Sequence, residues 1–224
     1  MLFSEPKKPR LVIIVPNGIF IIFHERTRTM SKAERTKAFI IEKTAPVFNT
    51  KGYAGTSIAD LSEATGLTKG SIYGNFSNKD EVALAAFDHN FQKVQNIVKV
   101  EMAKRSGVLD QLMVYVSVYD GFEKYPFPLG GCPILNTATE SDDTHPELRK
   151  KVAAAIISWK NSLVSLLEKG IKTKEIRATV DAEQTAIAII ALIEGGIMVA
   201  KVTGKINYRK AVMQSVEKMI RGLK

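Results

Sequence analysis

The stretch TSIADLSEATGLTKGSIYGNF, residues 56–76, contains two short segments with helical spacing of apolar residues on either side of a glycine corner. Residues 57–64 predict the first helix, and residues 68–75 predict the second, with Thr68 as its N-cap. Gly66 between them tolerates the left-handed backbone that a tight corner requires. This is the spacing of a helix-turn-helix unit, whose second helix enters the major groove of DNA.

The second helix keeps small and polar residues on its outward face. Gly70 and Ser71 allow a close approach to base edges, and Lys69 can donate to guanine acceptors or to a phosphate. Tyr73 and Asn75 can donate to phosphate oxygens and so fix the register on the duplex. Together with neighbouring hydroxyl and ammonium groups, the candidate DNA-binding residues are Thr56, Ser57, Thr68, Lys69, Gly70, Ser71, Tyr73, Asn75 and Lys79.

The overall composition agrees with an anionic partner. The 224 residues include 32 Lys and Arg against 23 Asp and Glu, a formal net charge of +9. Basic proteins of this kind often bind nucleic acid. The excess is densest near the N-terminus, where residues 1–29 hold five basic residues against two acidic ones. Cys132, the single cysteine, excludes an internal disulfide and suits a reducing cytoplasm.

Residues 1–29 stand apart from the rest of the chain. Residues 11–23, LVIIVPNGIFIIF, are apolar but shorter than the roughly 20 residues that a membrane-spanning helix needs. A β-hairpin around Pro16-Asn17-Gly18, a signal-peptide core and a membrane anchor are alternatives. We favour an N-terminal extension that precedes a natural start at Met30, because SKAE follows directly as a helix-opening capping box.

From residue 30 on, the sequence predicts helices throughout and no strand. Thr144 with Glu147 is interpreted as a second capping box, and Gly170 as the end of the long helix that follows. Asp181 with Gln184 opens the next helix, and Asn207 opens the last. The predicted helices cover residues 32–50, 57–64, 68–75, about 78–104, 107–124, 131–140, about 146–169, and two segments after residue 181.

The stretch KGYAGTSIADLSEATGLTKGSIYGNFSNKDEV, residues 51–82, resembles the DNA-binding region of the TetR family of bacterial transcriptional regulators. The matched positions are Gly52-Tyr53, Thr56-Ser57-Ile58, Asp60-Leu61, Ala64, Gly66-Leu67-Thr68, Gly70, Ile72-Tyr73, Phe76 and Asn78-Lys79. Asn75 departs from the His or Tyr that many members carry there. The strong resemblance covers about residues 34–85, and GGCPILNTATESDDTHPELR resembles one subset of TetR C-terminal domains more weakly.

The resemblance implies an all-α protein that acts as a repressor and is not an enzyme. Its expected partners are a palindromic DNA operator, a second copy of the chain and a small-molecule effector, with no cofactor. We expect an N-terminal extension over residues 1–29, a three-helix DNA-binding domain over 30–78, and a helical ligand-binding and dimerisation domain over 79–224. An effector that shifts the helix starting near residue 78 would move the recognition helix and release the DNA.

The apolar character of residues 186–200 predicts a dimer independently of the family resemblance. Residues 186–200, AIAIIALIEGGIMVA, are apolar on nearly all faces, which predicts burial on two sides. In a chain of this size, one side would pack on the core and the other on a second subunit. We expect the dimer to form through helices near residues 186–200 and 207–223.

Aromatic residues after position 80 are candidates for an effector pocket, although ordinary core packing explains the same pattern. The candidates are Phe87, Phe91, Tyr115, Tyr119, Phe122, Trp159 and Met198. The acidic run around Glu140 and His145 could hold a metal, but helix capping accounts for it, and we expect no metal site. A helical-bundle enzyme is a weaker alternative, because the chain has three histidines and no Glu-x-x-His pair.

Overall fold

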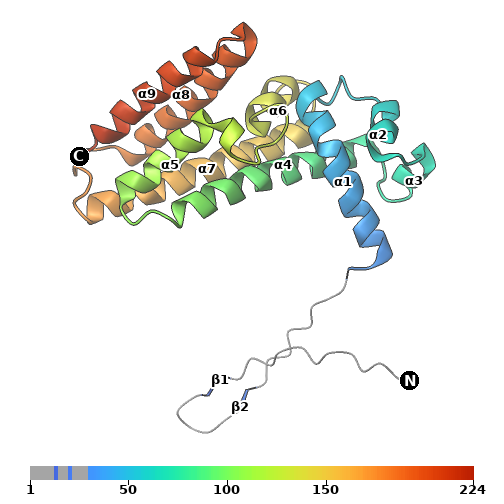
Figure 1. Ribbon diagram of the computed structural model, residues 1–224, viewed down its shortest axis with the longest axis horizontal. Coiled ribbons are helices and arrows are strands. Elements are labelled where there is room, and N and C mark those ends of the chain that lie inside the picture. Colours follow the sequence, from blue (N-terminus) through green and yellow to red (C-terminus); the bar gives the residue numbers. More distant parts are fainter. Residues whose placement is uncertain (1–12, 15–19, 22–29) are drawn as a thin grey trace.

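The computed structural model describes residues 13–14, 20–21 and 30–224. Two-residue strands β1 (Ile13–Ile14) and β2 (Phe20–Ile21) pair antiparallel, and the rest of the 11–23 segment lies outside the described residues. From residue 30 the described chain is all-α, as predicted (Figure 1). Its helices are α1 (Lys32–Lys51), α2 (Ile58–Thr65), α3 (Lys69–Tyr73), α4 (Lys79–Met102), α5 (Val108–Asp120), the 3-10 helix η1 (Phe122–Lys124), α6 (Pro133–Ser141), α7 (Pro146–Lys172), α8 (Ala182–Thr203) and α9 (Ile206–Arg221).

The first of two hydrophobic cores joins α1, α2, α3 and the first two turns of α4. Ile40, Leu61 and Ile72 are completely buried in it, and Phe76 follows from the end of the α3 segment. The predicted capping box at Ser31 and Glu34 opens α1, and Gly52 ends it with φ of +73°. These apolar residues fix the small unit at one end of the molecule, where α2 and α3 project (Figure 1).

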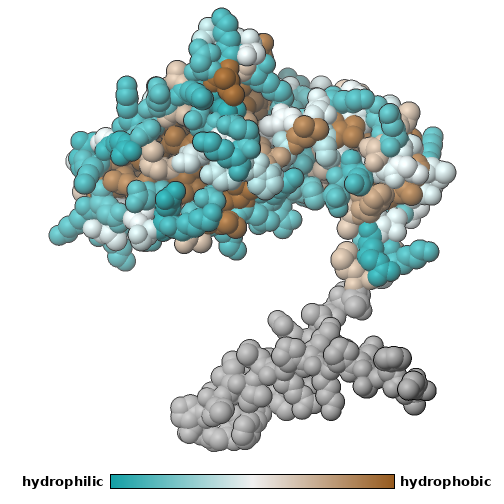
Figure 2. Space-filling model, in the orientation of Figure 1, coloured by the Kyte–Doolittle hydropathy of each residue, from teal (hydrophilic) through white to brown (hydrophobic). Residues whose placement is uncertain are grey.

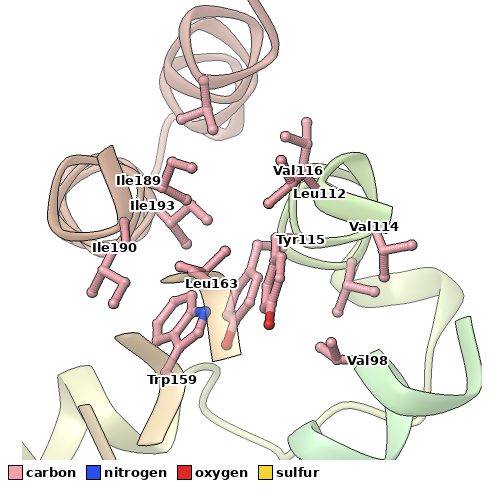
Figure 3. Close-up of a cluster of buried hydrophobic side chains, with 14 of the residues drawn as sticks. Val98, Leu112, Val114, Tyr115, Val116, Trp159, Leu163, Ile189, Ile190 and Ile193 are labelled. Carbon is pink, nitrogen blue, oxygen red and sulfur yellow. The ribbon is translucent and has the colours of Figure 1, made fainter. Parts of the chain in front are cut away.

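The second core fills the space between α4, α5, α7, α8 and α9. Leu112, Leu163, Ile189 and Ile193 have no solvent exposure. Figure 3 shows side chains of α5 facing those of α8 across this core, with Trp159 of α7 beneath them. The second core therefore forms a helical bundle that carries α4 along one side.

Helix α4 belongs to both cores. Val82 and Ala86 pack with the first core, whereas Val94 and Val98 pack with the second. Between them, the buried Asn90 Nδ2 donates to Ala45 O of α1 at 2.9 Å. Helix α4 is thus the continuous structural link between the two parts of the molecule.

Several predicted helix ends were wrong by a residue or more. The helix predicted over residues 107–124 ends at Asp120, and residues 122–124 form the separate 3-10 helix η1. His145, not Thr144, is the N-cap of α7, and its Nδ1 accepts from Leu148 N, while the Thr144 hydroxyl donates to Glu140 O. Gly170 lies inside α7, where a Cβ atom would come within 2.6 Å of Ile176 Cδ1, so this glycine serves close packing. Helix α9 begins at Ile206, one residue before Asn207.

Helix α8 is long and apolar enough to cross a membrane by length and composition. One of its faces is buried against α7 and α9, as expected for a core helix of a globular protein. The other face is exposed in the single chain, together with the start of α9, and Figure 2 shows hydrophobic surface at the tip where α8 turns into α9. The exposed apolar residues there are Ile187, Leu192, Met198, Val199, Val202, Ile206 and Tyr208.

Candidate nucleic-acid interface and effector cavity

The corner between α2 and α3 is built by short-range hydrogen bonds. Gly66 caps α2 in the left-handed conformation, with φ of +67°, and its N–H donates to Ser62 O at 2.8 Å. The buried Thr65 hydroxyl donates to Leu61 O and accepts from Leu67 N. These bonds satisfy the end of α2 and fix the direction in which α3 leaves the corner.

Helix α3 presents the outward face that the sequence predicts. Thr68 caps it by accepting from Ser71 N at 3.1 Å, and both hydroxyl groups are exposed. Lys69 and Gly70 are exposed as well, while Ile72 on the opposite face has no solvent exposure. The residue types on the open face are hydrogen-bond donors and small residues, which suits contact with base edges.

Tyr73 and Asn75 lie at the margin of this face and are half-buried. Lys69 Nζ lies 5.9 Å from the Tyr73 ring centre, and Asn75 Nδ2 donates to Ser71 O at 2.9 Å. Asn75 therefore uses one of its two amide hydrogens in the bond to Ser71 O.

The side chains of three other predicted contact residues make hydrogen bonds within the protein. The Thr56 side chain is buried, and its hydroxyl donates to Gly52 O at 2.6 Å. Ser57 is the N-cap of α2, and its hydroxyl donates to Asp60 Oδ2 and accepts from Asp60 N. Lys79 Nζ donates to Tyr53 O and Thr56 O at 2.8 and 3.0 Å, which uses two of its three hydrogens.

A cavity of about 450 Å³ opens between α4, α5 and α7. Four of the predicted pocket residues, Phe91, Tyr115, Tyr119 and Trp159, line it. The Trp159 ring stacks on Tyr119 at 5.2 Å and on Tyr115 at 5.9 Å, and Figure 3 shows Trp159 beside Tyr115. The other lining residues are Gln92, Val94, Gln95, Asn96, Val98, Lys99, Met102 and Ser162.

The remaining three pocket candidates do not line this cavity. Phe87 is buried and stacks on Phe91 behind the cavity wall, at 6.1 Å. Phe122 lies under the Arg209 guanidinium at 4.7 Å and lines a different hollow near the α8–α9 turn. Met198 is on the exposed face of α8, because the helix turns that position away from the core.

The electrostatics of the cavity favour hydrogen-bond donation by the protein. Burial raises the pKa values of both Tyr115 and Tyr119 well above their ordinary range, so both phenols stay neutral. Among the described residues, Trp159 Nε1 is buried without an acceptor. The lining contains one cation, Lys99, and no carboxylate. A ligand with acceptor oxygens fits these groups better than a cation does.

Comparison with known proteins decides the family. Residues 40–86 match the bacterial regulatory proteins of the tetR family, and residues 108–216 match the tetracyclin repressor-like C-terminal domain. A TetR-family regulator from Cytophaga hutchinsonii is 49% identical, covers 88% of this chain and 98% of its own, and superimposes with a TM-score of 0.85. The chain belongs to the TetR family.

Two further relatives agree. A TetR regulator from Chloroflexus aurantiacus J-10-FL is 39% identical, with 86% of this chain and 97% of its own covered and a TM-score of 0.81. The HTH-type transcriptional regulator TtgR of Pseudomonas putida is 26% identical over 172 residues, which are 75% of this chain and 81% of TtgR. This TetR-family chain is accordingly a helix-turn-helix DNA-binding transcriptional regulator, and the family is not enzymatic.

Cys132 of this TetR-family regulator is a buried thiol next to a buried carboxyl group. Its Sγ donates to Glu194 Oε1 at 3.0 Å, and Glu194 Oε2 is buried without a partner among the described residues. Burial raises the thiol pKa well above its ordinary value and raises the pKa of Glu194 to about 7. The thiol is therefore protonated and weakly reactive at neutral pH.

The sequence did not point to the residues that join the two parts of the molecule. Glu140 accepts two backbone hydrogen bonds from the turn before α2, and His145 packs its ring edge-on to Tyr53 at 4.5 Å. Within the described part of the chain, no group of three or more His, Cys, Asp or Glu side chains could hold a metal ion. Asn49 is a buried polar residue at this junction, and no sequence pattern indicates its burial.

Proposed function

We propose that this protein is a repressor that binds a palindromic operator as a homodimer and leaves it when a small molecule fills the cavity between α4, α5 and α7. The observation that carries the proposal is the position of α4. Its first turns belong to the core of the helix-turn-helix unit, and its later turns form one wall of the cavity. Cytoplasmic DNA is the proposed site of action.

The exposed apolar face of α8 and α9 supports the dimer. Val202 is 82% exposed and Ile206 is 54% exposed in the single chain, although both are large apolar residues. A patch of this kind is typical of a protein interface. A two-fold dimer through α8 and α9 places two α3 helices on successive major grooves, about 34 Å or a multiple apart.

The proposed DNA contacts differ in kind. Lys69 and Ser71 stand on the open face of α3 and are proposed to contact base edges. Tyr73, Asn75 and Lys79 are proposed to contact phosphates. Thr56 and Ser57 serve the local fold through their side chains, so any contact to DNA there comes from the backbone N–H groups at the start of α2.

The cavity supports an effector that is mostly apolar and flat, with acceptor oxygens. Stacked rings of Tyr115, Tyr119 and Trp159 provide one wall, and the neutral phenol groups supply donors. Lys99 adds a positive charge at the α4 side. An effector that binds more tightly when α4 is shifted would lower the affinity for the operator, typically by 5- to 150-fold.

The decisive experiment has two steps. Purified protein first selects duplexes from a random DNA pool, and light scattering measures the size of the complex; a monomer, or a pool without a recurring palindrome, rejects the operator proposal. Thermal-shift screening then identifies a small molecule that stabilises the protein, and fluorescence anisotropy follows the operator during its titration. The control is Trp159→Ala, which removes one cavity wall and leaves α3 intact. A cavity ligand that leaves operator affinity unchanged rejects the release mechanism.

A further inference from the structure

The turn that precedes α2 is held by a carboxylate from the other part of the molecule. Glu140, in the last turn of α6, accepts from Tyr53 N at 2.6 Å through Oε2 and from Ala54 N at 2.7 Å through Oε1. A Cβ atom on Gly52 would lie 2.5 Å from Glu140 Oε2. The carboxylate therefore occupies the space where a side chain of residue 52 would be.

A second set of bonds ties α6 to the end of α1. Asn49 Nδ2 donates to Leu129 O at 2.7 Å and to Gly131 O at 3.0 Å. Asn136 Nδ2 of α6 donates in the other direction to Asn49 O at 3.0 Å, and it also donates to Gly130 O of the loop before α6 at 3.0 Å. Asn49 is only 4% exposed, so these bonds form in a largely water-free contact, where each lost partner is costly.

The same Asn136 side chain is connected to α8. Lys201 Nζ donates to Asn136 Oδ1 at 2.6 Å and to Gly130 O at 3.1 Å. Hydrogen bonds thus run from α8 through α6 to the C-terminal end of α1 and to the turn at Tyr53. Figure 1 shows α6 lying between the bundle and α1.

Two routes therefore orient the helix-turn-helix unit relative to the bundle. One is α4, which continues from the unit into the second core. The other is the α6 clamp, which we define as Asn136 and Glu140. Two separate contacts with a rigid unit restrict its angle more than one contact does, and the clamp supplies the second contact beside α4.

We propose that Asn136 and Glu140 are positioning residues that set the separation of the two α3 helices, and so select the half-site spacing of the operator, without touching DNA. The inference rests on the proposed dimeric DNA binding. Neither residue lies in the helix-turn-helix unit, and neither lines the effector cavity. Their contribution is geometric: they restrict the angles that the unit can adopt before DNA binds.

The test uses the full chain and a series of operators. The selected palindrome is prepared with its native spacing and with one base pair added to or removed from the centre. Wild type, Glu140→Ala and Asn136→Ala are compared by fluorescence anisotropy at one salt concentration. Glu147→Gln, an exposed carboxyl group at the start of α7, is the control for the change in net charge.

We expect Glu140→Ala to lose about 10-fold in affinity for the native spacing and about 2-fold for the altered spacings. The ratio of affinities between native and altered spacings should therefore fall by about 5-fold. Asn136→Ala should change the preference in the same direction, and Glu147→Gln should not change it. Equal losses at all spacings, or none, in both alanine variants would overturn the inference, since a purely structural role lowers the folded fraction for every duplex alike. A wild type that selects no duplex rejects the proposed function and the clamp together, whereas unchanged spacing preference in the variants rejects the clamp alone.

Discussion

The buried carboxyl group of Glu194 makes folding stability depend on pH. Burial is the main cause that raises its pKa from 4.5 to about 7. In the unfolded chain this group loses its proton near pH 4.5, so between pH 4.5 and 7 the folded state binds more protons. Each pH unit in that window costs about 1.4 kcal/mol of stability. The contribution of Glu194 to the free energy of unfolding is fully present below pH 4.5. It falls as the pH rises from 4.5 to 7, and it no longer changes above pH 7.

Glu194→Gln keeps the size and the acceptor oxygen for Cys132 but removes the titration. The free energy of unfolding of this variant, relative to wild type, should rise by roughly 2 to 3 kcal/mol between pH 5 and pH 8. Urea unfolding at four pH values, at one protomer concentration, measures it, because dimer stability depends on concentration. Glu147→Gln, with an exposed carboxyl group, is the control. A difference between Glu194→Gln and wild type that does not change with pH would refute the reasoning.

Four further predictions concern DNA, effector and assembly. Lys69→Ala should change the selected sequence, whereas Lys79→Ala should weaken all duplexes alike and reduce the salt slope by about 1, as salt titrations of both variants would show. A chain beginning at Met30 should fold and bind the operator with nearly wild-type affinity, measured by circular dichroism and anisotropy. Val202→Glu should be monomeric by light scattering and should lose operator binding. Trp159→Ala should bind the operator normally but respond at least 10-fold less to a cavity ligand, as isothermal titration would record.

Local patterns were sufficient for most of the fold. The α2–α3 corner was predictable because Gly66 and the apolar spacing on both sides of it act over a few residues. Capping at Ser31 and Asp181 was predicted correctly for the same reason. His145 replaced Thr144 as a cap because neighbouring polar residues compete for the same position, and sequence spacing alone does not rank them.

Features that depend on distant contacts were not predictable. In the sequence, Gly170 has the character of a residue that ends a helix. In the fold it lies inside α7, where the missing side chain leaves space for Ile176. The sequence suggests that the Thr56 hydroxyl is free to contact DNA, but in the fold this hydroxyl donates to Gly52 O. Glu140 lies 87 residues from Tyr53, so no local pattern could connect them. The aromatic cavity was predicted only in part, since Met198 has the right character but points to the other face of α8.

In the proposed release mechanism, Asn90 is the point through which a change in the cavity would be transmitted to the helix-turn-helix unit. Its bond to Ala45 O fixes α4 to α1 near the middle of the helix, while the turns around Val82 pack in the core of the helix-turn-helix unit and the turns around Val98 pack in the bundle. These two points are 16 residues, or roughly 24 Å, apart along α4. A ligand that displaces the later turns must either rotate α4 about Asn90 or break that bond. Rotation strains the α6 clamp, which holds the turn at Tyr53 from the other side. A clamp that resists rotation keeps the unit in its DNA-binding orientation without ligand, and the same resistance limits how far the effector can lower operator affinity. Weakening the clamp should therefore lower operator affinity in the absence of ligand and increase the further loss of affinity that the effector causes.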